Sequence, residues 1–476
     1  MSFKEFASTD ALGLAALIAS KKIKASEAMD AAIAHAEAMN PKLNAIVFSD
    51  YDGARAAARG KPAKGAFAGV PMLLKDMRAN VAGWPTRSGS RYVPATPAAV
   101  ESTTVTRFKA AGLLPIGKTN VPEFGILPTT ESKLYGPAHN PWNSAHSTGG
   151  SSGGSAATVA AGIVPIAHAT DGGGSIRIPA SACGLVGLKA TRGRVSQGPE
   201  AGDATSGLSI DGVVTRSVRD TAAALDALCG IDYGDPYFAP PPEGSYLDGI
   251  RRKPKRLRIA VSTRMMNGTP HDPEVTAAVK KTAKLCESLG HIVEETDPPI
   301  SAGELVSAFS TIWSANVAYS LTTLQRLTGI APSLSVVEGL TLGLYVMGLG
   351  VSAVQLTEAR QAMMRAGRVI AKWHETYDVW LTATLGRPPM KLGTIDIDET
   401  NVQKGFAPNF GYVPFTSMQN STGTPGINLP LNWSKDGLPL GVQFTARAGG
   451  EMTLLKLAAE LEKAAPWADR YSKLRI

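Results

Sequence analysis

Two clusters of glycine and serine carry the residue types in this chain that could do chemistry. The first runs from Gly149 to Ser155 and the second from Asp171 to Arg177. Ser175 follows three glycines, so it could attack a carbonyl whose oxygen is held by backbone N–H groups that no side chain blocks. We expect Ser175 to be a nucleophile, with an oxyanion hole built from the backbone N–H groups of Gly172, Gly173, Gly174 and Ser175.

A nucleophilic serine needs a base. Histidine is the usual one, and three histidines lie near the clusters in sequence: His139, His146 and His168. Lys75 is the better candidate because it ends the apolar run Val70–Leu74 and should be buried there. Burial lowers the pKa of a lysine from about 10.4, and only the neutral amine accepts a proton. The alternative is an ion pair between Lys75 and Asp76.

The clusters fit a flexible linker or a phosphate-binding loop less well. A glycine/serine run can be a linker, but the first cluster leads directly into residues 156–161, which are typical of a buried helix. A glycine-rich loop before a helix can also bind phosphate, but no Gly-Lys-Ser/Thr follows.

The elements that must position these residues alternate between strand and helix. Residues 69–76 and 113–117 are predicted strands, and Ser102 should cap a helix that ends at Ala111. The alternation continues at 163–169, 218–228, 257–261, 273–289, 291–294, 379–383, 426–430, 441–444 and 451–463. This order predicts an α/β fold with a large mixed, twisted sheet and helices on both faces.

Two further segments are predicted to be helical. Near the N-terminus, helices are expected over residues 11–20 and from Ser26 to Glu37. Asn40-Pro41 is the stop signal after the second helix. From Ser301 to about Tyr377 the pattern is helical and rich in large apolar residues. Most of these should pack in a core, and the rest could line an apolar pocket.

The composition excludes several classes of protein. The chain has 476 residues, 44% of them hydrophobic and 18% charged, with a net charge of +8. The one tight basic run, residues 251–256, is more typical of a solvated linker than of a nucleic-acid site.

Three cysteines without a CxxC pair predict no disulfide framework and no zinc site. No signal peptide and no long apolar run is visible, so we expect a cytoplasmic protein that needs no membrane, metal or cofactor.

Several motifs together resemble the amidase signature family of serine hydrolases. The resemblance covers nearly the whole chain and is most specific between about residues 69 and 215. The matching stretches are 69–76, 117–124, 140–143, 149–157, 171–179, 184–189, 425–430 and 436–443. It implies one domain over 1–476, with a helical N-terminal part (1–60), a signature core (65–230) and a helical lobe on the substrate side (300–378).

The resemblance implies a Ser–Ser–Lys triad and an acyl-enzyme. Ser175 would be the nucleophile, Ser151 the bridging serine and Lys75 the base. The 24-residue separation of the two serines is the family's usual interval and favours Ser151 over Ser152. A cis peptide bond is implied at Gly150-Ser151. The residues implied to support the triad are Ser152, Asp171 and Arg177.

One position departs from the family's pattern, and the substrate stays open. Many members have threonine where this chain has Gly172, so the loop could be looser or the pocket larger. Residues 177–184 and 191–196 look like bacterial amidases that act on apolar or xenobiotic amides, including 6-aminohexanoate-cyclic-dimer hydrolases and aryl acylamidases. We expect a small-molecule or oligomeric amide substrate, and the pocket candidates are Gly125, Ile126, Leu127 and Trp313.

Two alternatives to an amide hydrolase follow from the same resemblance. A carbamate presents nearly the same carbonyl to the same oxyanion hole, so a urethanase with the same triad is possible. A protein similar to the amidase component of glutamyl-tRNA amidotransferase would act with partner chains. The C-terminal half lacks the Gly-Tyr-Tyr-Asp stretch expected of such a component. A homodimer is possible, and no nucleic-acid partner is expected.

Overall fold

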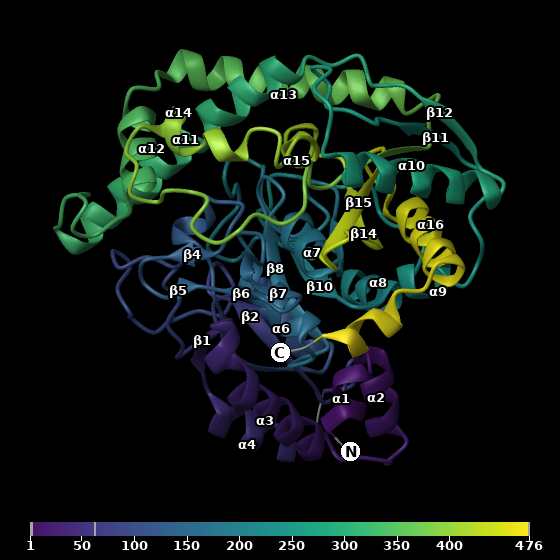
Figure 1. The fold of residues 1–476 in the computed structure, drawn as a ribbon. Helices are drawn as coiled ribbons and strands as arrows, with labels where there is room; N and C mark the ends of the chain where they lie inside the picture. The colour runs from purple at the N-terminus through teal and green to yellow at the C-terminus, as the bar shows by residue number, and fades with distance from the viewer. Residues whose placement is uncertain (1–2, 61–62, 475–476) are drawn as a thin grey trace.

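The chain folds around a mixed sheet of eleven strands (Figure 1). The computed structural model describes residues 3–60 and 63–474. The strands of this sheet are β1 (Ile46–Ser49), β2 (Val70–Lys75), β3 (Leu113–Thr119), β8 (Ile166–Asp171), β9 (Val186–Lys189), β10 (Ile210–Thr215), β11 (Arg258–Val261), β12 (Ile292–Glu295), β13 (Val379–Ala383), β14 (Gly426–Trp433) and β15 (Pro439–Ala446). Two small hairpins add β4 (Glu131–Ser132) with β5 (Gly136–Pro137), and β6 (His139–Asn140) with β7 (Asn143–Ser147).

The strand order in the large sheet is β1-β3-β2-β8-β10-β9-β14-β15-β13-β11-β12. Strand β2 pairs in parallel with β3 and β8, and β11 pairs in parallel with β12 and β13. The pairs around β10, β14 and β15 are antiparallel. The central strands β2, β8, β9 and β15 are buried along their whole length, as expected for strands that helices cover on both faces.

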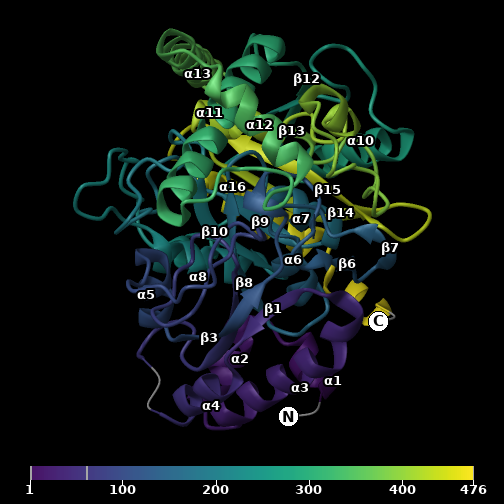
Figure 2. The same cartoon turned by 90° about the vertical axis from the view of Figure 1, so that its left-hand side faces the viewer.

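Helices cover both faces of the sheet, as Figures 1 and 2 show. They are α1 (Phe3–Ser8), α2 (Ala11–Ala19), α3 (Ala25–Leu43), α4 (Tyr51–Arg59), α5 (Thr103–Ala110), α6 (Gly153–Ala160), α7 (Arg177–Cys183), α8 (Val218–Leu228), α9 (Tyr246–Gly249), α10 (Pro273–Ser288), α11 (Ala302–Thr328), α12 (Gly339–Leu349), α13 (Ala353–Trp373), α14 (Val402–Gly405), α15 (Thr416–Thr422) and α16 (Glu451–Ala464). Short 3-10 turns cover Glu123–Gly125, Ala407–Asn409 and Ala468–Lys473. The predicted α/β class is confirmed.

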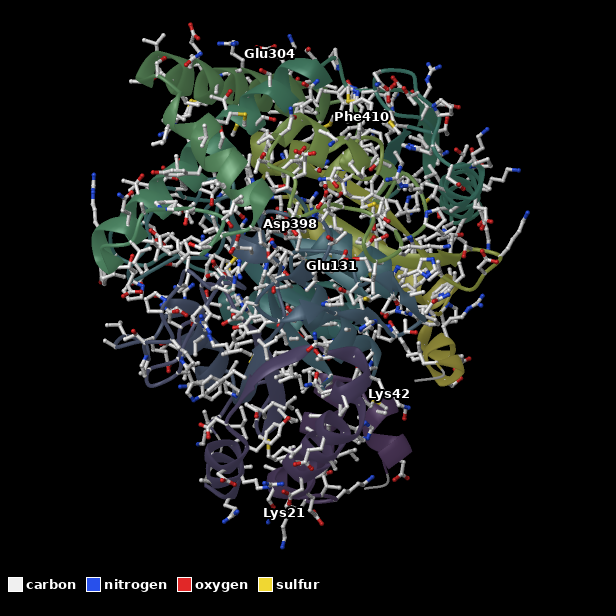
Figure 3. All side chains as sticks on the ribbon, turned by 60° about the vertical axis from the view of Figure 1, so that its left-hand side comes forward. Lys21, Lys42, Glu131, Glu304, Asp398 and Phe410 are labelled. Atoms are coloured by element: carbon white, nitrogen blue, oxygen red, sulfur yellow. The ribbon has the colours of Figure 1, made fainter. Side chains whose placement is uncertain are left out.

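The N-terminal helices and the helices of residues 302–373 lie at opposite ends of the molecule (Figures 1 and 2). Figure 3 labels Lys21 and Lys42 at the first end and Glu304 and Phe410 towards the second. Within the described residues, no single helix is long and apolar enough to cross a membrane. Helices α12 and α13 pass that test only as a pair, and they are bent by 104° at the break between them.

Two details differ from the sequence-based expectation. Strands β9 and β10 lie in the middle of the sheet but were not predicted, because glycine interrupts both of these short runs. Helix α3 continues past the predicted end at Glu37 and through Pro41 to Leu43. A proline in the last turn removes only one hydrogen bond of the helix, and the left-handed conformation of Asn44 provides the actual end.

Candidate active site

Lys75 lies at the carboxyl end of β2 and is completely buried. Its Nζ is 2.7 Å from Ser151 Oγ and 2.8 Å from Thr170 Oγ1. Burial lowers the pKa of Lys75 to about 7, although the carboxylates of Asp211 and Asp171 act in the opposite direction. A substantial share of this amine is therefore neutral near pH 7, with a hydroxyl within hydrogen-bond distance.

The neighbouring Asp76 does not serve as the partner of Lys75. Its carboxylate accepts hydrogen bonds from the backbone N–H of Arg87 at 2.9 Å and from the Tyr135 hydroxyl at 2.8 Å. Asp76 therefore helps to hold the loop that follows β2. The amine of Lys75 therefore contacts the hydroxyl groups of Ser151 and Thr170 and not the Asp76 carboxylate.

A chain of buried polar groups runs behind Lys75. The backbone N–H of Lys75 donates to His168 Nδ1 at 3.4 Å, and His168 Nε2 lies 3.0 Å from Asp211 Oδ1. Arg78 Nη2 lies 3.8 Å from Asp211 Oδ2. Burial lowers the pKa of His168. His168, one of the three histidines considered as a base, thus supports the lysine strand instead of facing the serines.

The first glycine/serine cluster packs closely against its surroundings. The peptide bond Gly150-Ser151 is cis, which confirms the implied geometry. Helix α6 begins two residues after Ser151, and a Cβ at Gly154 would lie 2.4 Å from the backbone nitrogen of Asn120. Only glycine permits that approach, so the cluster is a packed turn and not a linker. The Ser152 hydroxyl bonds to the backbone of Thr170 at 3.3 Å.

The second cluster is held by a buried ion pair. Arg177 donates to both carboxylate oxygens of Asp171, at 2.8 and 2.9 Å. Burial alone would raise the pKa of Asp171, but Arg177 outweighs it and holds that pKa at about 2. The remaining hydrogen-bond partners of the guanidinium come from α15 and β15: the oxygens of Thr416, Gln419, Asn420 and Gln443. The loop that carries Ser175 is therefore anchored to the C-terminal part of the sheet.

The expected set of oxyanion donors becomes smaller by one. The N–H of Gly174 donates to Asp171 Oδ1 at 2.8 Å, so it points away from an incoming carbonyl. The positive φ of Gly174, 133°, permits that turn. In the described part of the chain, the N–H groups of Gly172, Gly173 and Ser175 donate to no protein acceptor. These three remain as candidate donors.

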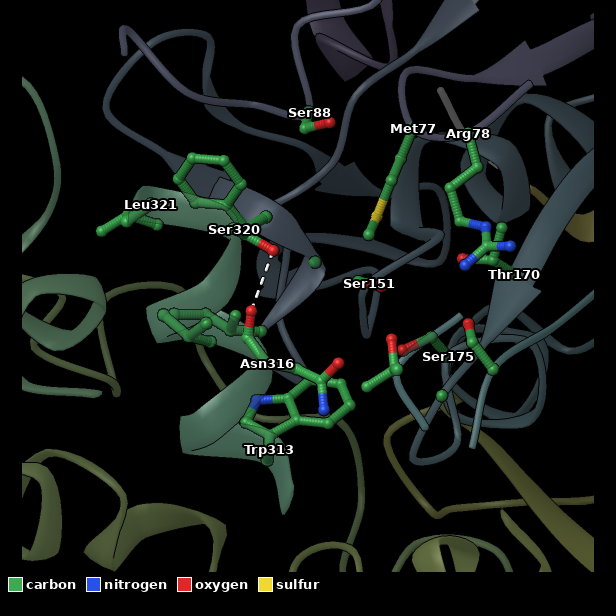
Figure 4. Close-up of a pocket in the computed structure, with 17 residues that line it drawn as sticks. Met77, Arg78, Ser88, Ser151, Thr170, Ser175, Trp313, Asn316, Ser320 and Leu321 are labelled. Atoms are coloured by element: carbon green, nitrogen blue, oxygen red, sulfur yellow. Dashed lines mark hydrogen bonds between the residues drawn. The ribbon is translucent and has the colours of Figure 1, made fainter. Parts of the chain in front are cut away.

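Ser151 and Ser175 both face one cavity of about 200 Å³ (Figure 4). Its apolar lining comes from Met77, Phe124, Ile126, Trp313, Val317 and Leu321. Its polar lining includes Arg78, Ser88, Thr170, Thr205, Ser209, Asn316 and Ser320. A cavity with this lining can hold a small molecule that is mostly apolar.

Three of the four pocket candidates line this cavity: Gly125, Ile126 and Trp313. Leu127 instead packs, buried, in the apolar cluster beneath α12. It is not among the residues that line the cavity, so the structure does not support the expectation for Leu127.

The sequence analysis missed most of the wall that α11 provides. Residues 313, 316, 317, 320 and 321 of this helix all line the cavity. They recur with the helical spacing i, i+3, i+4, i+7 and i+8, so they lie on one face. That stripe is visible in the sequence, but the same spacing is expected of a helix that buries its face in a core.

The Amidase family model matches residues 27–455. The chain belongs to the amidase signature family. A putative amidase, AmiC, of Mycobacterium bovis is 40% identical over 96% of this chain and 95% of its own. A 6-aminohexanoate-cyclic-dimer hydrolase of Paenarthrobacter ureafaciens is 37% identical over 98% of this chain and 96% of its own.

Solved structures give the same result. A 6-aminohexanoate cyclic dimer hydrolase in complex with substrate superposes with a TM-score of 0.92 at 36% identity, covering 97% of this chain and 98% of the other. A bacterial aryl acylamidase of the family gives 0.87 at 28% identity, covering 98% of both. The predicted resemblance and the amidase signature fold are confirmed. The protein is an amidase-family hydrolase that acts on amides.

Proposed function

We propose that this protein cleaves the C–N bond of an apolar, aryl or oligomeric amide through Ser175, Ser151 and Lys75. The observation that carries the proposal is the buried amine of Lys75 at 2.7 Å from Ser151 Oγ, beside the cavity that Ser175 also faces. A neutral lysine next to a hydroxyl can start a proton relay without a histidine.

In the proposed relay, Lys75 takes the proton of Ser151 while Ser151 takes the proton of Ser175. The Ser175 oxygen then attacks the carbonyl carbon of the amide. Ser151 gives a proton to the nitrogen as the C–N bond breaks and takes one back from Lys75, because an unprotonated amide anion is a very poor leaving group. Water finally releases the acid from the acyl-enzyme with the same groups.

The oxyanion of the tetrahedral intermediate would be held by the N–H groups of Gly172, Gly173 and Ser175. Each such donor contributes about 3 kcal/mol to the stabilisation of a transition state. Asp171 and Arg177 act indirectly, because they fix the backbone that presents these donors. Ser152 has the same kind of supporting role through its bonds to Thr170.

The substrate class follows from the lining of the cavity. Most of its side chains are apolar or neutral, and the charge of Arg78 is shared with Asp211. The named relatives include hydrolases of a cyclic amide dimer and of aryl acylamides. We therefore propose an uncharged amide of small size or an oligomer, with no cofactor.

The test is the replacement Ser175→Ala. It should reduce the hydrolysis of p-nitroacetanilide by at least about a thousandfold, since the nucleophile is lost while the fold is kept. Circular dichroism and the melting temperature serve as the control for folding. Anilide hydrolysis at the wild-type rate in this variant would refute the assignment of Ser175.

A carbamate is the second candidate substrate. Its carbonyl has nearly the same geometry as that of an amide, and the three candidate N–H donors would bind only that carbonyl oxygen. A comparison of kcat/KM for an anilide and for the phenylcarbamate of the same amine decides between them. A larger value for the carbamate would make the protein a urethanase with the same catalytic groups.

A further inference from the structure

Two aromatic side chains of α11 contact the loop that carries Ser175. A Cβ at Gly172 would lie 3.2 Å from Cζ3 and 3.4 Å from Cη2 of the Trp313 indole. A Cβ at Gly173 would lie 2.9 Å from Cζ of Phe309. The two rings are stacked, with centroids 5.1 Å apart and an angle of 20° between their planes. The absence of side chains at both glycines therefore makes room for this aromatic pair.

The backbone does not require glycine at position 172. Its φ lies outside the left-handed region, whereas Gly174 has a φ of 133°. A side chain at 172 would meet the indole before anything else, because the next atom, Ser209 Oγ, lies at 3.6 Å. The space left at Gly172 is thus occupied by Trp313, and the pocket is not enlarged there.

Trp313 forms a flat wall of the cavity close to the reacting groups. Figure 4 shows its indole on the side of the cavity opposite Met77, with Ser175 to one side between them. A flat indole prefers offset stacking on another planar group. A thioether across the cavity also contacts ring edges favourably. A planar group bound against the indole can make these contacts, whereas a puckered ring of equal size cannot stack on it.

We propose that Trp313, held in place by Gly172 and Phe309, is a specificity-determining residue that selects substrates with a planar ring or conjugated group next to the scissile carbonyl. This inference rests on the proposed function. It assigns no role in the proton relay to Trp313. The indole acts by contacting the substrate, so it changes which amide is cleaved more than how the bond is broken.

The test compares planar and puckered rings of the same size on each side of the amide. On the acyl side, benzoyl and cyclohexanecarbonyl p-nitroanilides share one leaving group. On the amine side, acetanilide and N-cyclohexylacetamide share one acyl group. In the wild type, the ratio of kcat/KM for planar over puckered substrates should exceed the corresponding ratio of rate constants for uncatalysed hydrolysis in at least one series. The series in which it does so identifies the side of the amide that the indole contacts.

The variants separate stacking from simple packing. Trp313→Ala should lower the ratio of kcat/KM for planar over puckered substrates by roughly threefold to tenfold, and Trp313→Phe should keep most of that ratio. Gly172→Thr should also lower it, because the new side chain displaces the indole. The double variant should lose no more than either single one, since both act through the same contact. Tyr319→Ala, which removes an exposed ring of the same helix, is the matched control.

The outcomes are distinct from those of the proposed function. If the wild type cleaves none of the four amides, the proposed function fails. If it cleaves them but both ratios stay unchanged in Trp313→Ala, or if the effects of the two positions simply add, the role of Trp313 is refuted. Should Trp313→Ala not fold, as judged by circular dichroism, Trp313→Leu provides the same comparison with a side chain that still fills the space.

Discussion

At the scale of single residues, the pKa of Lys75 decides the pH dependence of the activity. Burial and the positive charge of Arg78 lower this pKa, the carboxylates of Asp211 and Asp171 raise it, and the net result is a pKa of about 7. Only the neutral amine can accept the proton of Ser151. The activity should therefore be low below the pKa, rise through pH 7 as the lysine loses its proton, and level off above it.

Arg78→Gln should move that rise to higher pH. The substitution removes a cation near Lys75 and the charge that partly neutralises Asp211, and both changes favour the charged lysine. We expect the midpoint of the profile of kcat/KM to increase by roughly half a unit to one unit. The exposed Arg91→Gln is the control. A midpoint that stays in place would mean that Lys75 is not the group that titrates.

The sequence was most informative at this scale. Ser175 could be selected from the three glycines before it and Lys75 from the apolar run that it ends, whereas Ser151 was added by the resemblance to the amidase signature family. The fate of the Gly174 N–H could not be predicted, because it depends on the orientation of the Asp171 side chain within a folded loop. Thr170 and Asp211 were missed for a similar reason, since a buried threonine or aspartate in a strand has no distinctive sequence pattern.

At the scale of elements, two buried glutamates join the 3-10 turn Glu123–Gly125, which borders the cavity, to helix α12. Glu123, which precedes the lining residue Phe124, accepts hydrogen bonds from Ser90 Oγ at 2.7 Å and from the backbone N–H of Glu338 at 2.8 Å. Glu338 is the N-cap of α12 and accepts from the N–H of Lys133 at 2.7 Å. Burial, together with the charge of Glu123, raises the pKa of Glu338 to about 8.

This arrangement makes the stability depend on pH. The folded state keeps a proton on Glu338 that the unfolded chain loses above about pH 4.5, so its contribution is complete below that pH and is lost as the pH rises through 8. Glu338→Gln stays neutral throughout. We expect it to be about as stable as the wild type at pH 5 and about 1 to 3 kcal/mol more stable at pH 9.

Chemical denaturation at the two pH values measures this difference. Glu358→Gln, an exposed position on α13, is the control and should give equal values at both. A Glu338→Gln variant that is less stable than the wild type at pH 9 would contradict a neutral Glu338. The glutamate pair was beyond sequence reasoning, because its members are separated by more than 200 residues and meet only when α12 docks.

At the scale of the whole molecule, one chain supplies every group of the proposed site. Lys75, Ser151 and Ser175 come from the first half of the chain, and one wall of the cavity comes from α11. The sequence predicted this α/β organisation from its alternating elements. The central strands β9 and β10 were not predicted, because glycine interrupts their short runs and β9 pairs with the distant β14.

We therefore propose that the protein acts without a partner chain. Its specific activity on an anilide should stay constant between about 10 nM and about 10 µM protein, because dissociation of a required assembly would lower it on dilution. Salt-dependent binding of RNA is not expected, and fluorescence anisotropy with a labelled tRNA measures it. Activity that appears only after a co-purified protein is added back would favour a component of a larger complex.

Because the cavity stripe lies on α11, the choice of substrate and the cleavage of the bond depend on different elements of the fold. The five cavity positions of the stripe follow the turn of one helix, while the groups proposed for bond cleavage lie on the strands and loops of the sheet. A combinatorial library at residues 313, 316, 317, 320 and 321 would resurface the cavity while Lys75, Ser151 and Ser175 stay unchanged. A single inserted residue earlier in α11 would instead rotate the stripe by about 100° and remove the whole wall at once.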